Sequence, residues 1–205
     1  MRVQLRIVAG ALRGRKLTCN LNSDLRPTPD RVREALFNIL GDAVPDRPFV
    51  DVFAGSGVVG LEALSRGARS VLFLERDLRL AHDIETNLRA FGYADKAQVL
   101  RSDVYRWATS WQAPEPVNVY VSPPFADIQK RTDDLLLLIS HVQRKMPASS
   151  VLVVQSEKHS ELDGHPALAE WEERRYGRNV LLIWEPGQTK DGEPVANDKD
   201  GEPVA

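Results

Sequence analysis

Short apolar segments alternate with amphipathic ones along most of this chain, and that alternation restricts its fold more than any other feature. We expect strands at about 48–53, 70–74, 97–101, 117–121 and 151–154. We expect helices at about 30–40, 57–66, 78–91, 103–109 and 129–145, and a closing hairpin at 171–176 and 179–184. Strands that alternate with helices are joined by right-handed crossovers, and the helices then cover both faces of the sheet. The pattern therefore predicts an α/β fold with a mostly parallel sheet.

The composition fits one compact domain with an extension at each end. A chain of 205 residues, 42% of them hydrophobic, is long enough to bury a substantial core. We expect a basic amino-terminal extension at 1–29 and the main domain at 30–185. Residues 186–205 are polar, acidic and turn-rich and contain the sequence DGEPVA twice, which predicts a disordered acidic tail.

The single cysteine, Cys19, excludes an internal disulfide framework and is compatible with a reducing compartment. The chain has no run of about 18 apolar residues, and its first residues lack the apolar core of a signal peptide. Its four histidines are scattered without the spacing of metal ligands. We therefore expect a soluble, cytoplasmic, monomeric protein with no membrane partner and no metal site.

A glycine-rich segment at 51–60, DVFAGSGVVG, lies between an expected strand and an expected helix. Glycines in such a turn let a nucleotide-like ligand lie against bare backbone at a helix amino terminus. The segment also satisfies the dinucleotide fingerprint G-x-G-x-x-G. Glu75 follows Gly55 by 20 residues, where that fingerprint has its ribose-binding acid. A nicotinamide dinucleotide is therefore one candidate ligand, and a ligand-free turn is another interpretation.

Three features favour S-adenosylmethionine (SAM) over a nicotinamide cofactor. Asp51 precedes the glycines by four residues, inside a strand that dinucleotide-binding folds usually keep apolar. Phe53 and Ala54 occupy the approach to the turn, as they do in SAM sites. The remainder of the chain is short and shows no second half with a nicotinamide site.

Suitable polar residues stand at four consecutive strand ends. Gly55–Gly57 follows the first expected strand and Glu75 the second. Asp103 follows the third, and Ser122–Phe125 follows the fourth. Ligands of open α/β sheets bind outside the carboxyl ends of the strands. We therefore expect these four segments to form one site.

The residue types predict how SAM is held. Gly55 and Gly57 allow close approach of backbone to its methionine portion, and Asp51 receives the ammonium directly or through water. Glu75 accepts hydrogen bonds from the ribose hydroxyls, and Asp103 accepts one from the adenine amino group. The other residues expected in the cofactor pocket are Phe53, Ala54, Ser56, Arg76 and Val104.

Each of these roles has a structural alternative. An ordinary strand–helix turn would explain the glycines, and an internal hydrogen bond would explain Asp51. A surface ion pair with Arg76 would explain Glu75. A helix N-cap would explain Asp103, and this interpretation is compatible with binding of adenine.

The sequence Ser122-Pro123-Pro124-Phe125 predicts a short rigid loop at the fourth strand end, and we expect these four residues to form the catalytic loop. The Ser122 side chain and the Pro123 carbonyl can accept hydrogen bonds from an exocyclic amino group. Phe125 can stack on an extruded base, with core packing as the alternative. Together with a SAM pocket, this loop predicts methyl transfer to an amino group of a nucleobase.

The net charge of −2 conceals a basic amino-terminal region. Residues 1–33 contain eight Lys and Arg residues against two Asp residues, a local balance of +6. Such a region suggests contact with a polyanion, and a solvated, partly disordered leader is the alternative. The residues expected to contact RNA phosphates are Arg6, Arg13, Arg15, Lys16, Arg26 and Arg31.

Two segments, 26–40 (RPTPDRVREALFNIL) and 51–57 (DVFAGSG), carry a family resemblance. They resemble the RsmD family of bacterial 16S rRNA guanine-N2 methyltransferases, and the similarity runs from about residue 5 to 185. The resemblance implies the class I SAM-dependent methyltransferase fold, Rossmann-like, with a seven-stranded, mostly parallel sheet. It also implies that Phe37 and Asn38 line the methionine and adenosine side of the cofactor pocket. The implied substrate is the N2 amino group of a guanine in 16S rRNA or in a 30S assembly intermediate.

Ser122 departs from the family, which usually has Asp-Pro-Pro-Phe or Asp-Pro-Pro-Tyr at this place. A serine hydroxyl accepts one hydrogen bond from the amine, but it does not stabilise developing positive charge as a carboxylate does. Two alternatives therefore stay open. One is a SAM-binding ribosome-assembly factor with weak or no catalysis, and the other is a methyltransferase for another amino group, adenine N6 or cytosine N4.

Overall fold

The computed structural model describes residues 1–20 and 26–188. Its strands are β1 (Arg2–Arg6), β2 (Lys16–Asn20), β3 (Pro48–Val52), β4 (Ser70–Leu74), β5 (Ala97–Leu100), β6 (Asn118–Val121), β7 (Val151–Glu157), β8 (Glu172–Tyr176) and β9 (Asn179–Trp184). Its α-helices are α1 (Asp30–Leu40), α2 (Val58–Ser65), α3 (Leu78–Phe91), α4 (Val104–Ser110), α5 (Phe125–Lys130) and α6 (Thr132–Gln143). No helix in this part of the chain is long and apolar enough to cross a membrane. Most of the expected acidic tail, residues 189–205, lies outside the described residues.

Seven strands form one sheet in the order β5-β4-β3-β6-β7-β9-β8. Neighbouring strands from β5 to β7 are parallel, and β9 is antiparallel to both β7 and β8. The parallel strands are mostly apolar because helices cover both of their faces. The predicted α/β fold with a seven-stranded, mostly parallel sheet is confirmed.

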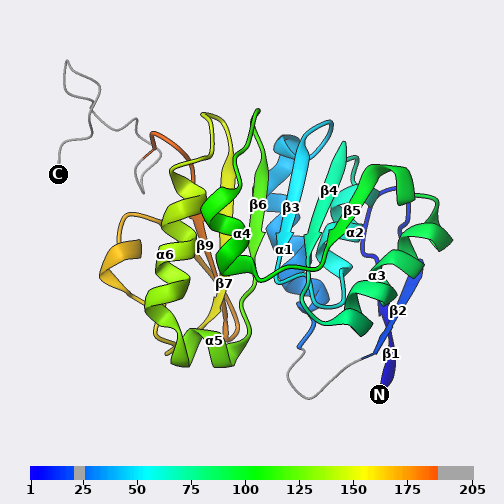
Figure 1. Cartoon of the computed structure of the whole chain (residues 1–205), viewed down its shortest axis with the longest axis horizontal. Helices are drawn as coiled ribbons and strands as arrows, with labels where there is room; N and C mark the ends of the chain where they lie inside the picture. The colour runs from blue at the N-terminus through cyan, green and yellow to red at the C-terminus, as the bar shows by residue number, and fades with distance from the viewer. Residues whose placement is uncertain (21–25, 189–205) are drawn as a thin grey trace.

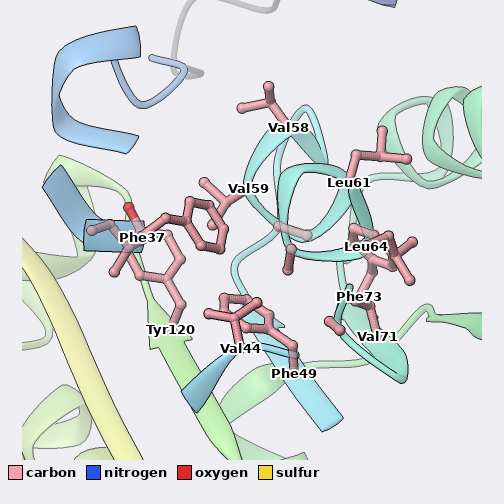
Figure 2. Packing of buried hydrophobic residues seen from close by; sticks show 14 of the residues in the cluster. Phe37, Val44, Phe49, Val58, Val59, Leu61, Leu64, Val71, Phe73 and Tyr120 are labelled. Atoms are coloured by element: carbon pink, nitrogen blue, oxygen red, sulfur yellow. The ribbon is translucent and has the colours of Figure 1, made fainter. Parts of the chain in front are cut away.

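The helices lie in two layers, one on each side of this sheet (Figure 1). Successive side chains of a strand point to opposite faces. On one face, Phe49, Phe73 and Tyr120 pack with residues of α1, α2 and α3, and Figure 2 shows Phe37 and Val59 within this cluster. On the other face, alternate strand residues pack with α4, α5 and α6. Both faces of the central strands are therefore closed, and ligands have access only at the strand ends.

β1 and β2 form a separate antiparallel sheet beside α3 (Figure 1). The side chains of Leu17 and Cys19 in β2 and of Ile7, directly after β1, are fully buried. The Asn87 side chain of α3 accepts a hydrogen bond from the Thr18 N–H at 3.1 Å and donates one to the Thr18 carbonyl at 2.9 Å. Neither strand is among those expected from the sequence. The basic side chains of this region therefore project from a hairpin that is packed on the main domain.

Arg33 belongs to the basic amino-terminal run but is only 1% exposed. Its Nε donates to Glu62 Oε2 at 3.1 Å, and its terminal nitrogens donate to the carbonyls of Thr28 and Arg6 at 2.7 and 2.6 Å. Glu62 is completely buried and also pairs with Arg66 at 2.8 Å. This network joins the hairpin, the segment before α1 and helix α2. Arg33 is therefore a structural cation, unavailable to a polyanion.

The helix expected at about 129–145 is two helices, α5 and α6, which meet at Arg131. Arg131 has φ −137° and ψ 34°, a conformation that interrupts the helix. Its guanidinium lies over the ring of Tyr105, 3.8 Å from the ring centre. The break allows α5 to start directly after the Pro-Pro sequence, at Phe125.

Candidate active site

The four strand ends expected to form a site meet at one edge of the sheet, the edge where α5 follows β6 in Figure 1. β3 lies between β4 and β6, so the strand order reverses there. Val52 is paired with both Leu74 and Val121, and Leu74 is paired with Leu100. These pairs are the last of their ladders. The segments that follow β3, β4, β5 and β6 therefore start at the same level, side by side.

The turn between β3 and α2 contains three residues with a left-handed backbone: Phe53 (φ 63°), Gly55 (φ 55°) and Gly57 (φ 73°). Glycine adopts this conformation without the steric cost that a side chain imposes. A Cβ atom at Gly57 would also lie 2.7 Å from Cγ1 of Ile84. A side chain at Gly57 would therefore strain the turn and displace Ile84.

Asp51 is almost completely buried in β3, and its Oδ2 accepts a hydrogen bond from the Gly60 N–H at 2.9 Å. This is the internal hydrogen bond that the sequence left open as an alternative. Burial raises the pKa of Asp51 to about 8, the bond to Gly60 lowers it, and the nearby Glu75 carboxylate raises it. A cationic group placed beside Asp51 would favour its ionised form.

Both oxygens of Glu75 accept hydrogen bonds from the backbone. Oε2 accepts from the Gly55 N–H and Oε1 from the Asp77 N–H, each at 2.8 Å. The carboxylate therefore ties the glycine turn to the end of β4, and burial raises its pKa. Glu75 and Arg76 form no ion pair within 4.0 Å in the described part of the chain, although the Arg76 charge lowers the pKa of Glu75. Each oxygen keeps a further lone pair, so the same carboxylate can still accept from ligand hydroxyls.

Asp103 is the N-cap of α4. Its Oδ1 accepts from the backbone N–H groups of Tyr105 and Arg106 at 2.9 and 3.1 Å. Within the described part of the chain, Oδ2 has no hydrogen-bond partner, and the side chain is exposed at the sheet edge. The capping role and an acceptor role toward a ligand therefore use different oxygens.

Of the remaining residues expected in the pocket, some are buried in the turn or under α4 and others are at the surface. Ala54 and Ser56 are buried in the glycine turn, and the Ala54 N–H donates to the Leu74 carbonyl at 2.9 Å. Val104 is buried at the first turn of α4, whereas Arg76 is exposed. The ring of Phe53 meets the ring of Tyr105 edge-on, with the ring centres 6.0 Å apart.

The Ser122–Phe125 loop faces the glycine turn. The Ser122 N–H donates to the Val52 carbonyl at 3.2 Å, which fixes the start of the loop against the end of β3. Pro123 is buried, and Pro124 is the N-cap of α5. Phe125 is 46% exposed, so core packing does not account for it. The loop therefore presents a hydroxyl and an aromatic ring at the edge where the expected cofactor residues gather.

The structure does not bring Phe37 and Asn38 to this edge. Thr28, just before α1, contacts Tyr120 and Gln155, whereas Phe37 in the last turns of α1 stacks on Phe49 at the start of β3, so α1 runs antiparallel to β3. Phe37 stacks on Phe49 with the ring centres 6.1 Å apart, and the Arg66 guanidinium lies 4.7 Å from its ring centre. Phe37 and Asn38 line a separate open hollow of about 470 Å³. The resemblance had implied a place for both in the cofactor pocket, and the direction of α1 separates them from it.

The segment before α1 reaches the site instead. Thr28 is buried, and its Oγ1 lies 3.1 Å from the hydroxyl of Tyr120 in β6 and 3.2 Å from Oε1 of Gln155 in β7. Sequence reasoning assigned no role to these three residues. The available signal was alternation, since Tyr120 lies two residues before Ser122 and so shares its face of the strand.

Among the described residues, none of the six side chains expected to contact RNA has a buried ion pair. Arg13, Arg15, Lys16 and Arg31 are exposed, and Arg26 is 67% exposed with Glu157 4.0 Å away. Arg6 is 61% exposed and lies 3.5 Å from Asp30. Arg13 and Arg15 lie in the turn before β2, and Lys16 is the first residue of that strand. The Arg15 guanidinium lies 4.6 Å above the ring of Phe91. The described residues contain no group of three or more His, Cys, Asp or Glu side chains that could hold a metal ion.

Comparison with known proteins gives relatives for most of the chain. The YlbH protein of Bacillus subtilis is 31% identical over 160 residues, which are 77% of this chain and 85% of that protein. Ribosomal RNA small subunit methyltransferase D of Escherichia coli is 42% identical over 122 residues. That alignment covers 60% of this chain and spans 61% of the length of the relative.

The fold is also shared with solved structures. A hypothetical protein of Thermus thermophilus is 32% identical with a TM-score of 0.71, covering 88% of this chain and 99% of that one. An RNA methyltransferase of Salinibacter ruber, solved with S-adenosylhomocysteine, has a TM-score of 0.57 at 17% identity over 86% of this chain and 99% of that one. The fold is therefore the class I methyltransferase fold. A family model described as "Conserved hypothetical protein 95" matches residues 5–185, and the predicted resemblance to RsmD is confirmed: the chain belongs to this family.

Proposed function

We propose that this protein transfers the methyl group of SAM to the exocyclic N2 amino group of a guanine in 16S rRNA. One observation carries the proposal. The glycine turn, Glu75, Asp103 and the Ser122–Phe125 loop stand at adjacent strand ends of a class I methyltransferase fold. Relatives named ribosomal RNA small subunit methyltransferase D support an rRNA substrate in this family.

The residues at this edge fit SAM. The left-handed turn at Gly55 and Gly57 leaves backbone open to the methionine portion of SAM. The ammonium of SAM, placed near Asp51, would favour the ionised form of this buried carboxyl. Glu75 has lone pairs left for the ribose hydroxyls, and Asp103 Oδ2 can accept from the adenine amino group. SAM supplies an electrophilic methyl group, and the chain supplies orientation on both sides of it.

The catalytic loop would hold the target base. Phe125 is exposed for stacking, and the Ser122 hydroxyl and the Pro123 carbonyl can accept from the two N–H groups of the amine. Those bonds favour a more tetrahedral nitrogen, whose lone pair then attacks the methyl carbon as the carbon–sulfur bond breaks. The surplus proton leaves to solvent. The chain's contribution is mainly proximity and orientation.

The test is a single-turnover assay with tritiated SAM. Its substrates are deproteinised 16S rRNA and 30S subunits, both from cells that lack the protein. Digestion of the labelled RNA to nucleosides should give N2-methylguanosine. Label in N6-methyladenosine or N4-methylcytidine would show that the target is the amino group of adenine or cytosine and would contradict the proposed guanine N2. Protein that binds SAM and RNA yet transfers no methyl would favour the assembly-factor alternative that Ser122 suggests.

Substitutions at Asp103 separate its two roles. Asp103→Asn keeps an oxygen for the cap but places an NH₂ group where Oδ2 stood, so we expect unchanged stability and several-fold weaker SAM binding. Asp103→Ala should weaken SAM binding similarly and also cost about 1 kcal/mol of unfolding free energy, because the cap is lost. Calorimetric titration and urea unfolding measure the two effects. Wild-type SAM affinity in the Asn variant would leave Asp103 as a cap only.

The hairpin is expected to contribute RNA affinity through phosphates. Replacing Arg13, Arg15 and Lys16 with alanine should weaken RNA binding and reduce the slope of log K against log[salt] by about 2–3, because fewer counterions are released. SAM affinity should not change. The matched control removes three exposed cations that lie outside the hairpin, Arg69, Lys96 and Arg144. Equal slopes in both triple variants would remove the hairpin from the RNA interface.

A further inference from the structure

Strand β7 extends beyond the end of β6, next to the catalytic loop. The two strands are parallel and their last pair is Val121 with Val154, whereas β7 continues to Glu157. Three further residues, at about 3.3 Å each, carry β7 about 10 Å past the level at which the loop starts. In the sheet order β3-β6-β7, the end of β7 stands on the flank of the loop that faces away from the glycine turn.

Three exposed cations surround Glu157 at this end of β7. Arg26 Nη1 lies 4.0 Å and Arg178 Nε lies 3.9 Å from Oε1 of Glu157. The two arginine side chains are 67% and 68% exposed. Lys158 is exposed as well, and its backbone N–H donates to the Arg178 carbonyl at 2.8 Å. These four residues, here called the Glu157 cluster, come from three distant segments of the chain and carry three positive charges against one negative charge.

The protein does not engage the cations of the Glu157 cluster. Among the described residues, Glu157 is the only carboxylate within 4.0 Å of either guanidinium, and both distances are at the limit of an ion pair. An exposed pair of this kind contributes little to stability. By contrast, Arg175 on the neighbouring strand β8 lies 2.8 Å from Asp163. Folding therefore does not account for the three cations of the cluster.

The backbone that carries the cluster is firmly held. β7 pairs with β9 as far as Glu157 and Asn179, and the Lys158 N–H closes the next bond across the two strands. On the other side, Thr28 follows Arg26 by two residues and lies 3.2 Å from Gln155. The cluster therefore presents mobile cationic side chains from a fixed frame beside the catalytic loop.

The basic turn before β2 lies in a different place. The Ala11 N–H donates to the Ser65 carbonyl at 2.7 Å, and Arg15 donates to the Ala90 carbonyl at 3.4 Å. Ser65 and Ala90 are in the last turns of α2 and α3. A helix that joins two parallel strands returns to the amino-terminal edge of the sheet. The cations of this turn and those of the Glu157 cluster are therefore set to contact different phosphates.

We infer that the Glu157 cluster binds phosphates of the RNA strand directly beside the target nucleotide. This inference rests on the proposed function. A base that is extruded into the catalytic loop stays joined to its neighbours, whose phosphates then pass along the edge of the sheet. The glycine-turn flank of the loop is the cofactor side, whereas the β7 flank offers Arg and Lys donors with no close partner. Such contacts fix the position of the strand and leave the choice of base to the loop.

The first test is the salt dependence of RNA binding after Arg26, Lys158 and Arg178 are replaced together with alanine. The slope of log K against log[salt] for 16S rRNA should fall by about 2, since each phosphate contact on a single strand contributes about 0.7. SAM affinity should stay at the wild-type value. The triple variant that serves as the control for the hairpin should bind with a steeper slope than this one. Arg26→Lys combined with Arg178→Lys should keep the wild-type slope, because a phosphate contact needs only the charge.

Glu157→Gln should act in the opposite direction. It removes the one negative charge of the cluster, so RNA binding should become about two- to fivefold tighter, the fold-change that corresponds to one exposed charge interaction. A residue with only a structural role would not strengthen RNA binding when it is substituted. Weaker or unchanged binding in Glu157→Gln would overturn the inference.

The position of the contact is tested with a photo-crosslinker attached to Lys158→Cys. Cys19, the only natural cysteine, is fully buried, so a thiol reagent labels the new position selectively. Crosslinks to 16S rRNA should map next to the methylated nucleotide, whereas those from the control Lys96→Cys should not. The same map from both positions would overturn the placement. A wild type that binds RNA but transfers no methyl would end the proposed function, and the salt slope and the Glu157→Gln result would still decide whether the cluster binds phosphates.

Discussion

Replacing Glu62 with glutamine is expected to lower the free energy of unfolding by about 3–5 kcal/mol, because it leaves two arginines without their common buried anion. Glu62 is completely buried, and its two oxygens pair with Arg33 at 3.1 Å and with Arg66 at 2.8 Å. Arg33 is itself 1% exposed, so its charge cannot recover water when the partner is lost. Urea unfolding with an unchanged slope against denaturant measures the loss.

The matched control is Asp30→Asn. Asp30 also pairs with Arg33, at 3.1 Å, but its side chain is 51% exposed. An exposed ion pair contributes little, so the expected loss is below about 1 kcal/mol. Similar small losses in both variants would mean that the buried network is not required for stability. Arg33 also donates to the carbonyl of Arg6, so the same network fixes the hairpin to the main domain.

The main sheet could be predicted because its strands are local, continuous apolar segments. The expected strand at 70–74 coincides with β4. The second strand of the expected hairpin, 179–184, has the same bounds as β9. Buried parallel strands have this pattern because both of their faces are covered. The bounds of the strands were then enough to place the Ser122–Phe125 loop and Glu75 at one edge.

The sequence of the β1–β2 hairpin has an alternating pattern typical of strands, but its many basic residues had suggested an extension without regular structure. In Arg2–Arg6, polar residues alternate with the partly buried Val3 and Leu5, the pattern of a half-buried strand. The same period occurs in Lys16–Asn20, where Leu17 and Cys19 are buried. A run of basic residues predicts that their side chains are exposed to solvent. It does not exclude that the same segment forms a regular strand.

The parts of the site that could not be predicted depend on long-range contacts. The sequence places Phe37 in a family motif, but only the direction of α1 shows that it packs on Phe49. The bonds of Glu75 to Gly55 and of Tyr120 to Gln155 join residues 20 and 35 positions apart. Composition and spacing name the polar groups of a site, whereas tertiary packing decides which of their atoms remain free for a ligand.

The second large effect concerns the pH dependence of stability without SAM, and its origin is Asp51. Burial is the chief reason that the pKa of this carboxyl rises from its ordinary value of 3.8 to about 8 in the folded protein. The protonated form is therefore favoured by folding. The resulting stability is fully present below about pH 4 and is lost as the pH rises through 8, at up to about 1.4 kcal/mol per pH unit.

Asp51→Asn removes this titration and keeps an oxygen for the Gly60 N–H. Between pH 5 and pH 8, we expect the wild type to lose up to about 4 kcal/mol relative to the variant, so the variant is the more stable protein at pH 8. Urea unfolding at both pH values measures the difference. Asp95→Asn, which removes an exposed carboxylate, is the control and should follow the wild type. Parallel behaviour of wild type and Asp51→Asn would mean that Asp51 has the same protonation in the folded and unfolded states.

The same variant tests why an acid stands at a position where an amide is more stable. A buried carboxylate that destabilises the empty protein is retained where a ligand gains from its charge. We expect Asp51→Asn to bind SAM at least about tenfold more weakly at pH 8, since a charge-assisted contact to the ammonium is lost. Greater stability together with weaker SAM binding would assign the carboxylate to the cofactor. Greater stability with unchanged SAM binding would leave Asp51 with the Gly60 bond alone, and the ammonium would have to be held by other groups of the glycine turn.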